Sequence, residues 1–362
     1  MKLTFLMSFI LTILLSLTSI NLNAQNDEDN GAAQVIPQPK LTIVSGFKGG
    51  SYYQMAKDMQ RMSRKELGIP VMVTETKEVP TIENGDTLKD EDGEPIMEEI
   101  ETKKPTGDTI DFLNVKDSDG SYYNFLKINK SDVDLTFLQY DVLLYEDMKD
   151  LKRKFKKVAD IRILLPVGVE HIHLITTKDS GIESFSDLKK KRVGIGSTLQ
   201  GTNITAKYIK EKTKSKWEDV EIPYDKAFRA LFNGDIDAFF FVGTAPINDL
   251  AHLAKSMKDK IKLISLPEND ALKEAYGDMV TIDNSYYSWV DKPVKTYAVK
   301  ALLVTSVRGQ TPEQVENIAK LMRIVKANKD KQGYFKGWEN VKFEEDPSIE
   351  FEYHPLMKEF FH

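Results

Sequence analysis

A loop rich in glycine and small polar residues joins a short apolar run to a helical pattern within residues 192–209. Such a loop leaves backbone N–H groups without partners, and the helix dipole adds positive potential, so the loop predicts an anion site. Gly196 and Gly201 have the spacing of a P-loop, but Thr202 and Asn203 stand where a P-loop has Lys and Ser/Thr. Because the lysine that clamps the β- and γ-phosphates is absent, the loop favours a carboxylate over a nucleotide.

Three more segments place glycine beside small hydroxyl or amide residues at the ends of predicted strands. They are residues 49–53, 120–124 and 243–246. Ligands bind outside the carboxyl ends of the strands in open α/β sheets, so the four loops together predict a shared cleft for a small molecule. Each loop taken alone also fits an ordinary turn or helix cap.

Residue types that carry out catalysis or bind metals do not gather beside these loops. His171 and His173 share one face of a predicted strand, but no third metal ligand is evident nearby, which favours structural or surface histidines. Ser197 is not in a Gly-x-Ser-x-Gly elbow. Residues 90–93 and 117–120 have aspartates at alternate positions before glycine, but both lack the full spacing of a calcium loop. We therefore predict a binding site without catalytic residue, metal or cofactor, rather than an enzyme.

Strand and helix patterns alternate along most of the chain, which predicts an α/β fold with parallel sheets covered by helices on both faces. The predicted strands are residues 41–44, 71–73, 133–138, 161–166, 171–176, 193–195, 236–242, 261–266 and an extended run at 294–306. The predicted helices are a segment starting near residue 51, residues 121–126, 142–149 and 186–190, a segment starting near 202, and residues 227–232, 246–258 and 312–326.

An acidic segment at residues 75–111 interrupts this alternation. It has thirteen Asp and Glu residues against four Lys residues. Asn84-Gly85 lies between two short β-like runs, residues 81–82 and 87–88, and so predicts a small hairpin. The remainder of the segment is predicted to be a solvated surface excursion.

The N-terminus has the pattern of an export signal. Lys2 precedes an apolar stretch from Leu3 to about Ile20, and the small residue Ala24 stands before a polar segment, so residues 1–24 are predicted to be a cleaved signal peptide, with an uncleaved anchor as the alternative. Residues 25–40 are polar and predict a disordered lead-in. The chain has no cysteine, which excludes disulfides and a cysteine-linked lipid anchor. Its net charge of −6 argues against nucleic acid and anionic membranes as partners.

The order of several short motifs between residues 41 and 362 resembles one known family, the TAXI-type solute receptors of TRAP (tripartite ATP-independent periplasmic) transporters. Each motif is weak alone, and the specificity comes from the series. The chain departs from the family at Gln200, where a small hydroxyl residue is expected. The motifs are Gly49-Gly-Ser-Tyr-Tyr53, Gly120-Ser-Tyr-Tyr-Asn124, Gln139-Tyr-Asp141, Glu170 to His173, Asp179-Ser-Gly-Ile182, Asp187-Leu-Lys189, Arg192 to Ser197, Gly234-Asp-Ile-Asp-Ala238, Gly243 to Pro246 and His354-Pro355.

This resemblance implies a two-lobed fold like that of periplasmic binding proteins, in which a hinge closes two α/β lobes on a ligand. Lobe I would comprise residues 41–164, including the acidic insertion, and 296–362, and lobe II residues 165–295. The ligand would be a small carboxylate, such as the amino acids glutamate or glutamine. The receptor would be a periplasmic monomer that delivers this ligand to integral membrane subunits of a TRAP transporter. A binding protein that reports to a membrane signalling protein is the alternative.

The resemblance also implies which residues contact the ligand. From lobe I they would be Gly50, Ser51, Tyr52, Ser121, Asn124 and Gln139. From lobe II, Ser197, Thr198, Gln200, Gly201 and Thr202 would hold a carboxylate, Gly243, Thr244 and Pro246 would line the cleft, and Tyr286 or Tyr287 would cover it. Gln200 would either shrink the pocket or add an amide to it.

Overall fold

The computed structural model describes residues 34–83, 85–154 and 156–361. These residues divide into two compact units. The smaller unit contains residues 34–35 and 73–104, and the larger contains 36–72 and the described residues from 105 onward. The predicted signal peptide, residues 1–24, lies outside the described residues. Within the described ranges, no helix is both long enough and apolar enough to cross a membrane.

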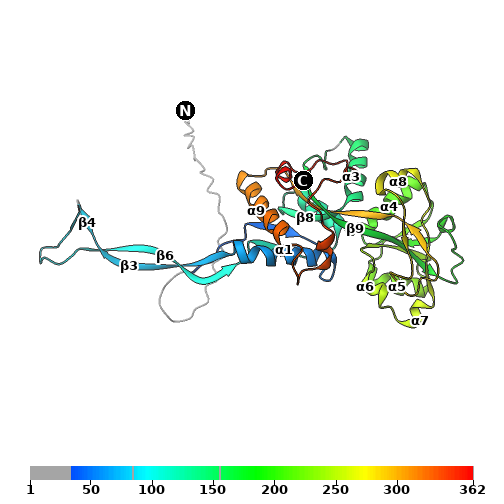
Figure 1. The fold of residues 1–362 in the computed structure, drawn as a ribbon, viewed down its shortest axis with the longest axis horizontal. Helices are drawn as coiled ribbons and strands as arrows, with labels where there is room; N and C mark the ends of the chain where they lie inside the picture. The colour runs from blue at the N-terminus through cyan, green and yellow to red at the C-terminus, as the bar shows by residue number, and fades with distance from the viewer. Residues whose placement is uncertain (1–33, 84, 155, 362) are drawn as a thin grey trace, which may run out of the picture. The chain divides into compact units, whose positions relative to one another are not determined.

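The larger unit is built on one nine-stranded sheet (Figure 1). Its strands are β2 (Leu41–Val44), β7 (Leu113–Lys116), β8 (Leu135–Gln139), β9 (Ile161–Thr177), β10 (Arg192–Gly194), β11 (Glu218–Val220), β12 (Ala238–Gly243), β13 (Ile261–Leu263) and β16 (Ala298–Ser306). A separate pair is formed by β14 (Val280–Ile282) and β15 (Val294–Thr296).

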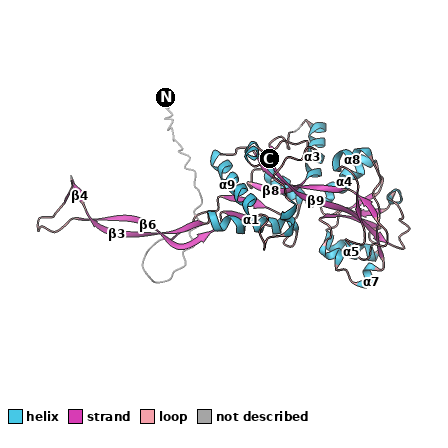
Figure 2. Ribbon diagram, in the orientation of Figure 1, coloured by secondary structure: helices cyan, strands magenta, loops and turns pink. Residues whose placement is uncertain are grey.

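Helices lie on both sides of these strands (Figure 2). They are α1 (Ser51–Leu67), α2 (Ser121–Asn129), α3 (Tyr140–Arg153), α4 (Gly201–Thr213), α5 (Tyr224–Asn233), α6 (Asn248–Ala251), α7 (Lys255–Lys258), α8 (Asp270–Tyr276) and α9 (Pro312–Asn328). Short 3₁₀ helices occupy η1 (Phe185–Leu188), η2 (Lys336–Asn340) and η3 (Pro355–Glu359).

The predicted α/β class and its arrangement in two halves are confirmed. The first half has parallel strands β7, β2 and β8, and the second has parallel strands β11, β10 and β12. Two separate sheets were expected, whereas the structure joins the halves in one sheet through the antiparallel neighbours β9 and β16. In Figure 1, the green strand β9 runs from the half with α1, α3 and α9 into the half with α5, α6 and α7. The lobe boundaries at residues 164/165 and 295/296 stay a prediction.

The strand β9 corrects the prediction of two separate strands at 161–166 and 171–176. It is continuous over Ile161–Thr177, and its pairing with β16 shifts register between Ala301 and Leu302. Gly168, at a φ of +148°, lies at this irregularity. The Pro166-Val-Gly168 segment is therefore a bulge within one strand and not a turn between two.

The helix predicted at residues 246–258 is also wrong as a single element. The structure divides it into α6 and α7. The indole Nε1 of Trp289 donates a hydrogen bond to the carbonyl oxygen of Leu250 at 2.8 Å. That carbonyl would accept the N–H of Ala254 in a continuous helix, so a side chain distant in sequence satisfies it instead.

Apolar side chains at helical spacing form the core of the first half. Met55, Met59 and Met62 make the buried face of α1, because residues spaced by three and four positions share a helix face. They belong to the same cluster as Leu321 and Val325 of α9. Ile172, Val193, Ile209 and Phe240 belong to a second cluster in the other half. The helix α4 reaches across to the first half, where Ile204 packs with Phe125 and Leu302.

The smaller unit is formed by the acidic segment. The strands β3 (Ile69–Pro80), β6 (Met97–Ile110) and β1 (Gln34–Val35) form a three-stranded sheet. The first residues of β3 and the last residues of β6 belong to the larger unit. Between them, β4 (Ile82–Glu83) pairs with β5 (Asp86–Thr87), which confirms the hairpin predicted around Asn84-Gly85. The prediction missed that the flanking acidic residues are strand residues too. Both faces of these strands are largely exposed, so charges are tolerated at alternate positions.

Candidate functional site

A cavity of about 90 Å³ lies where strands of both halves meet the helices that follow them. The first half supplies the loops before α1 and α2, and the second half supplies the loop before α4. This is the edge at which open α/β sheets bind ligands. The lining residues are Gly46, Phe47, Gly50, Ser51, Tyr52, Asp119, Gly120, Ser121, Gln139, Glu170, Gln200, Gly201, Thr202, Phe241 and Val242.

Three helices point their N-termini at this cavity. The N-cap residues are Gly50 for α1, Gly120 for α2 and Gln200 for α4, and none of the three makes a side-chain cap hydrogen bond. The first N–H groups of a helix have no acceptor within it, so an end without a side-chain cap keeps donors and the positive end of the dipole. In α2 one of these groups, the N–H of Tyr123, is already used by the carbonyl of Leu199. The three ends together make this side of the cavity a place for negative charge.

Glycine is required where the two halves approach each other. A Cβ atom added to Gly201 would lie 1.6 Å from Oε1 of Gln139, and one added to Gly120 would lie 3.1 Å from Cα of Gln200. Gly120 also has a φ of +142°, a conformation that residues with side chains rarely adopt. The backbone N–H of Tyr123 donates to the carbonyl of Leu199 at 3.0 Å and so joins the two halves directly.

The loop predicted to bind an anion already uses several of its polar groups. The Oε1 atom of Gln200 accepts a hydrogen bond from the backbone N–H of Ser197 at 2.9 Å. The Thr198 hydroxyl donates to Glu221, and the Thr202 hydroxyl accepts from the N–H of Val242. The loop therefore keeps its ligand donors at the start of α4, and Gln200 fills part of the space beside them.

Glu170, in the middle of β9, brings a buried carboxyl group to the cavity. Glu170 is 8% exposed, and Nε2 of Gln139 donates a hydrogen bond to Oε2 of Glu170 at 2.6 Å. Burial, the largest cause, and the nearby Asp141 carboxyl together raise the pKa of Glu170 from 4.5 to about 7, against the opposing effect of the Gln139 hydrogen bond. In the sequence, Glu170 stands out only as part of a strand motif with His173. A glutamate directly after the apolar run at residues 163–169 was the signal that could have found it.

Two polar atoms next to Glu170 lack hydrogen-bond partners among the described residues. One is Oε1 of Gln139, a residue that is 4% exposed, and the other is the buried hydroxyl of Tyr52. The Tyr52 ring stacks on Phe137 with centroids 5.1 Å apart. Its hydroxyl is close enough to Glu170 to lower the pKa of that carboxyl, although it does not reach hydrogen-bonding geometry. A buried polar atom without a partner costs stability, so these atoms indicate a site for a ligand.

Half of the residues predicted to contact ligand line this cavity, and the others do not. The lining ones are Gly50, Ser51, Tyr52, Ser121, Gln139, Gln200, Gly201 and Thr202. Those elsewhere are Asn124, Ser197, Thr198, Gly243, Thr244, Pro246, Tyr286 and Tyr287. The lining residues that sequence analysis did not name as contacts are Gly46, Phe47, Asp119, Gly120, Glu170, Phe241 and Val242.

Asn124 and Tyr287 hold the framework together. The Asn124 amide is fully buried and donates to the carbonyls of Ser45, just after β2, and Phe137, within β8, which ties α2 to both strands. The Tyr287 hydroxyl accepts from the N–H of Ile247 and contacts Nε2 of His173, each at 2.9 Å. With the hydroxyl buried and bonded in this way, Tyr287 does not cover the cavity.

The model of the NMT1-like family matches residues 93–326, which is more than half of the chain. The chain belongs to the NMT1-like family. Two solved structures are similar to this family member. One is an arginine transport system periplasmic binding protein from Legionella pneumophila, at 15% identity, with 80% of this chain and 95% of that chain covered and a TM-score of 0.39. The other is PhnD1 from Prochlorococcus marinus in complex with methylphosphonate, at 10% identity, with 83% and 88% covered and a TM-score of 0.45. At such identities neither similarity assigns a ligand to this chain.

His173 has a structural role in this NMT1-like protein. Its Nδ1 lies 2.9 Å from the carbonyl oxygen of His171, which can only accept, so Nδ1 carries the proton and Nε2 accepts from Tyr287. Burial lowers the pKa of His173 to about 3 and keeps the ring neutral. The two histidines share a face, as predicted. Searched over the described residues, no group of three or more His, Asp or Glu side chains is placed to hold a metal ion.

A second buried carboxyl connects the two halves. Oδ2 of Asp141, at the start of α3, accepts hydrogen bonds from the hydroxyls of Thr205 in α4 (2.6 Å) and Tyr276 in α8 (3.0 Å). Burial raises the pKa of Asp141 to about 6, and the two hydroxyl donors oppose that shift. This group does not line the cavity, and its contacts couple the first half to two helices of the second.

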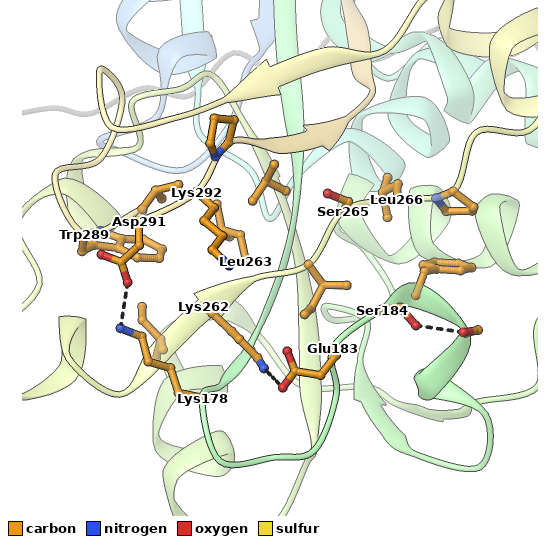
Figure 3. A pocket seen from close by; sticks show the side chains of 18 residues that line it. Lys178, Glu183, Ser184, Lys262, Leu263, Ser265, Leu266, Trp289, Asp291 and Lys292 are labelled. Atoms are coloured by element: carbon orange, nitrogen blue, oxygen red, sulfur yellow. Dashed lines mark hydrogen bonds and ion pairs between the residues drawn. The ribbon is translucent and has the colours of Figure 1, made fainter.

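The NMT1-like protein also has a larger hollow, of about 890 Å³, within its second half (Figure 3). Four of its five charged side chains form two ion pairs. Lys178 contacts Asp291 at 3.2 Å and Lys262 contacts Glu183 at 2.6 Å. None of its lining residues has a buried polar atom that lacks a partner among the described residues. The smaller cavity is therefore the better candidate site, because its polar groups still need partners.

Proposed function

We propose that this chain is an extracytoplasmic solute-binding receptor that captures a small carboxylate ligand between its two halves. The observation that carries the proposal is the convergence of three uncapped helix N-termini on one cavity bounded by both halves. Such donors hold a carboxylate through backbone N–H groups without any guanidinium. The cavity is lined by loops whose close approach depends on Gly120 and Gly201, so separating the halves would open it.

The finer identity of the receptor rests on the motif series. We propose a TAXI-type receptor of a TRAP transporter, exported to the periplasm, which acts as a monomer and delivers its ligand to integral membrane subunits. Amino acids such as glutamate and glutamine are the first ligands to test. The predicted contacts that line the cavity, from Gly50 to Thr202, are proposed to bind the ligand.

The test is ligand identification on the exported form of the chain, residues 25–362. Native mass spectrometry of protein purified without denaturation should show a bound small molecule, and isothermal titration should then show saturable binding of an amino acid after that molecule is removed. A folded protein that carries no small molecule and gives no heat with any amino acid or dicarboxylate would contradict the proposal. For the transporter assignment, uptake of the ligand by vesicles that contain the membrane subunits should depend on added receptor.

A further inference from the structure

The charges around the cavity do not match a ligand that is only an anion. Two carboxyl groups line it, Glu170 inside and Asp119 at an exposed position. Among the described residues that line it, there is no Lys, Arg or His. A dicarboxylate would place two negative charges beside these groups with only helix ends to offset them. A ligand with a positive group would meet a complementary charge.

Hydrogen-bond acceptors are concentrated around Glu170. The carboxylate of Glu170 on β9, the unpartnered Oε1 of Gln139 on β8 and the unpartnered hydroxyl oxygen of Tyr52 on α1 belong to residues that line the cavity. Gln139 and Glu170 are both more than nine-tenths buried. An ammonium group has three N–H donors and no acceptor, so it suits three acceptors of which one is charged.

The two kinds of polar group come from different parts of the chain, except that α1 supplies both. The acceptors are side chains of β8, β9 and α1, whereas the N–H donors are backbone groups in the first turns of α1, α2 and α4. A ligand with a carboxylate and an ammonium group close together could satisfy both sets at once. That description fits an α-amino acid.

We propose that Glu170, Gln139 and Tyr52 form an ammonium subsite, so that the cavity selects amino acids over carboxylates of the same shape that lack the amine. This inference rests on the proposed receptor function and names the ligand class for that site. Glu170 supplies the negative charge, Gln139 orients Glu170 through its Nε2 and accepts from the ligand through its Oε1, and Tyr52 closes the subsite on the side of α1.

The test compares amino acids with analogues that differ only by the amine. Isothermal titration at pH 8 would use glutamate against glutarate and alanine against propionate. The amino acid that binds should exceed its deaminated analogue in affinity by about 100-fold, the effect of removing a buried charge pair and its hydrogen bonds. If an analogue binds within threefold of its amino acid, the ammonium subsite is wrong and the receptor function stands. Silence toward every compound would overturn both.

Two variants probe the subsite itself. Glu170→Gln keeps the size of the side chain and removes its charge, so amino-acid affinity should fall at least 30-fold while affinity for the deaminated analogue stays or rises. Tyr52→Phe removes only the hydroxyl and should weaken amino-acid binding by three- to tenfold. Glu183→Gln, at an exposed position in the larger hollow, is the matched control and should change nothing. Unfolding temperatures measured for each variant would check that it folds. Amino-acid affinity unchanged by Glu170→Gln in a folded protein refutes the assignment.

Discussion

Ligand affinity should depend on pH through Glu170. In the free protein, burial sets the pKa of this carboxyl at about 7, so it is largely protonated and neutral below that pH. A bound ammonium group favours the ionised form and lowers the pKa in the complex. Binding below pH 7 must therefore displace the proton, which weakens the observed affinity. Above pH 8, Glu170 is already ionised and the affinity should be constant.

The size of the effect follows from the pKa. If the complex keeps Glu170 ionised, each pH unit below 7 weakens the affinity about tenfold, so the dissociation constant at pH 5 is about 100-fold that at pH 8. The titratable groups that face Glu170 are Tyr52 from α1 and Asp141 from α3, with Asp119 also at the cavity. The described lining residues from the start of α4 and from β12 are Gln200, Gly201, Thr202, Phe241 and Val242, none of which titrates. Protonation of Asp141 near pH 6 removes part of the repulsion and should flatten the lower end of the curve.

Isothermal titration from pH 5 to pH 9, in pairs of buffers with different ionisation enthalpies, measures both the affinity and the protons released. At pH 6 the wild-type protein should release close to one proton per ligand. Glu170→Gln should give a flat profile and no proton release. The sign is the critical result, because a ligand bound only as an anion would bind more tightly as Glu170 becomes protonated. Affinity that rises toward pH 5 would refute the ammonium assignment.

Three further substitutions test the geometry of the site. Gly201→Ala places a Cβ against Oε1 of Gln139. Ligand affinity measured by titration should fall more than tenfold, whereas the unfolding temperature should not fall. Unchanged affinity would show that the two halves do not approach each other as described. Gln200→Ser frees the N–H of Ser197 and enlarges a cavity that holds about three water volumes. It should therefore improve the affinity for glutamate relative to alanine at least fivefold, and an unchanged ratio would count against Gln200 as the residue that limits ligand size. Asp141→Ala removes the acceptor shared by two buried hydroxyls, of which Thr205 keeps the Gly201 carbonyl at 3.3 Å and Tyr276 is left unpaired. It should lower the free energy of unfolding in urea by about 2 kcal/mol, against less than about 1 kcal/mol for Asp141→Asn; equal losses would be inconsistent with the hydrogen bonds described.

Local patterns in the sequence were sufficient for most of the elements. The strand at residues 41–44 and the helix that begins at Ser51 are as predicted, because apolar spacing and a glycine loop are signals contained within a few residues. The same holds for the hairpin around Asn84-Gly85. The prediction of one helix at residues 246–258 was wrong because the indole of Trp289, far along the chain, donates a hydrogen bond to the carbonyl of Leu250.

Some features of the candidate site could likewise be predicted from the sequence, and others only from the structure. The sequence by itself showed that glycine loops follow several strands, and it predicted that these loops form a binding site for an anion rather than a catalytic site. Only the tertiary structure showed that Glu170 lies beside Gln139 and Tyr52. It also showed that the Gln200 amide oxygen accepts a hydrogen bond from the loop, and that the Tyr287 hydroxyl bonds to His173. The physical reason is that a loop's backbone donors are local, whereas burial and hydrogen-bond partners come from segments distant in sequence. The sequence shows that Glu170 is acidic, but only the packing around it shows that its carboxyl group is buried beside the cavity.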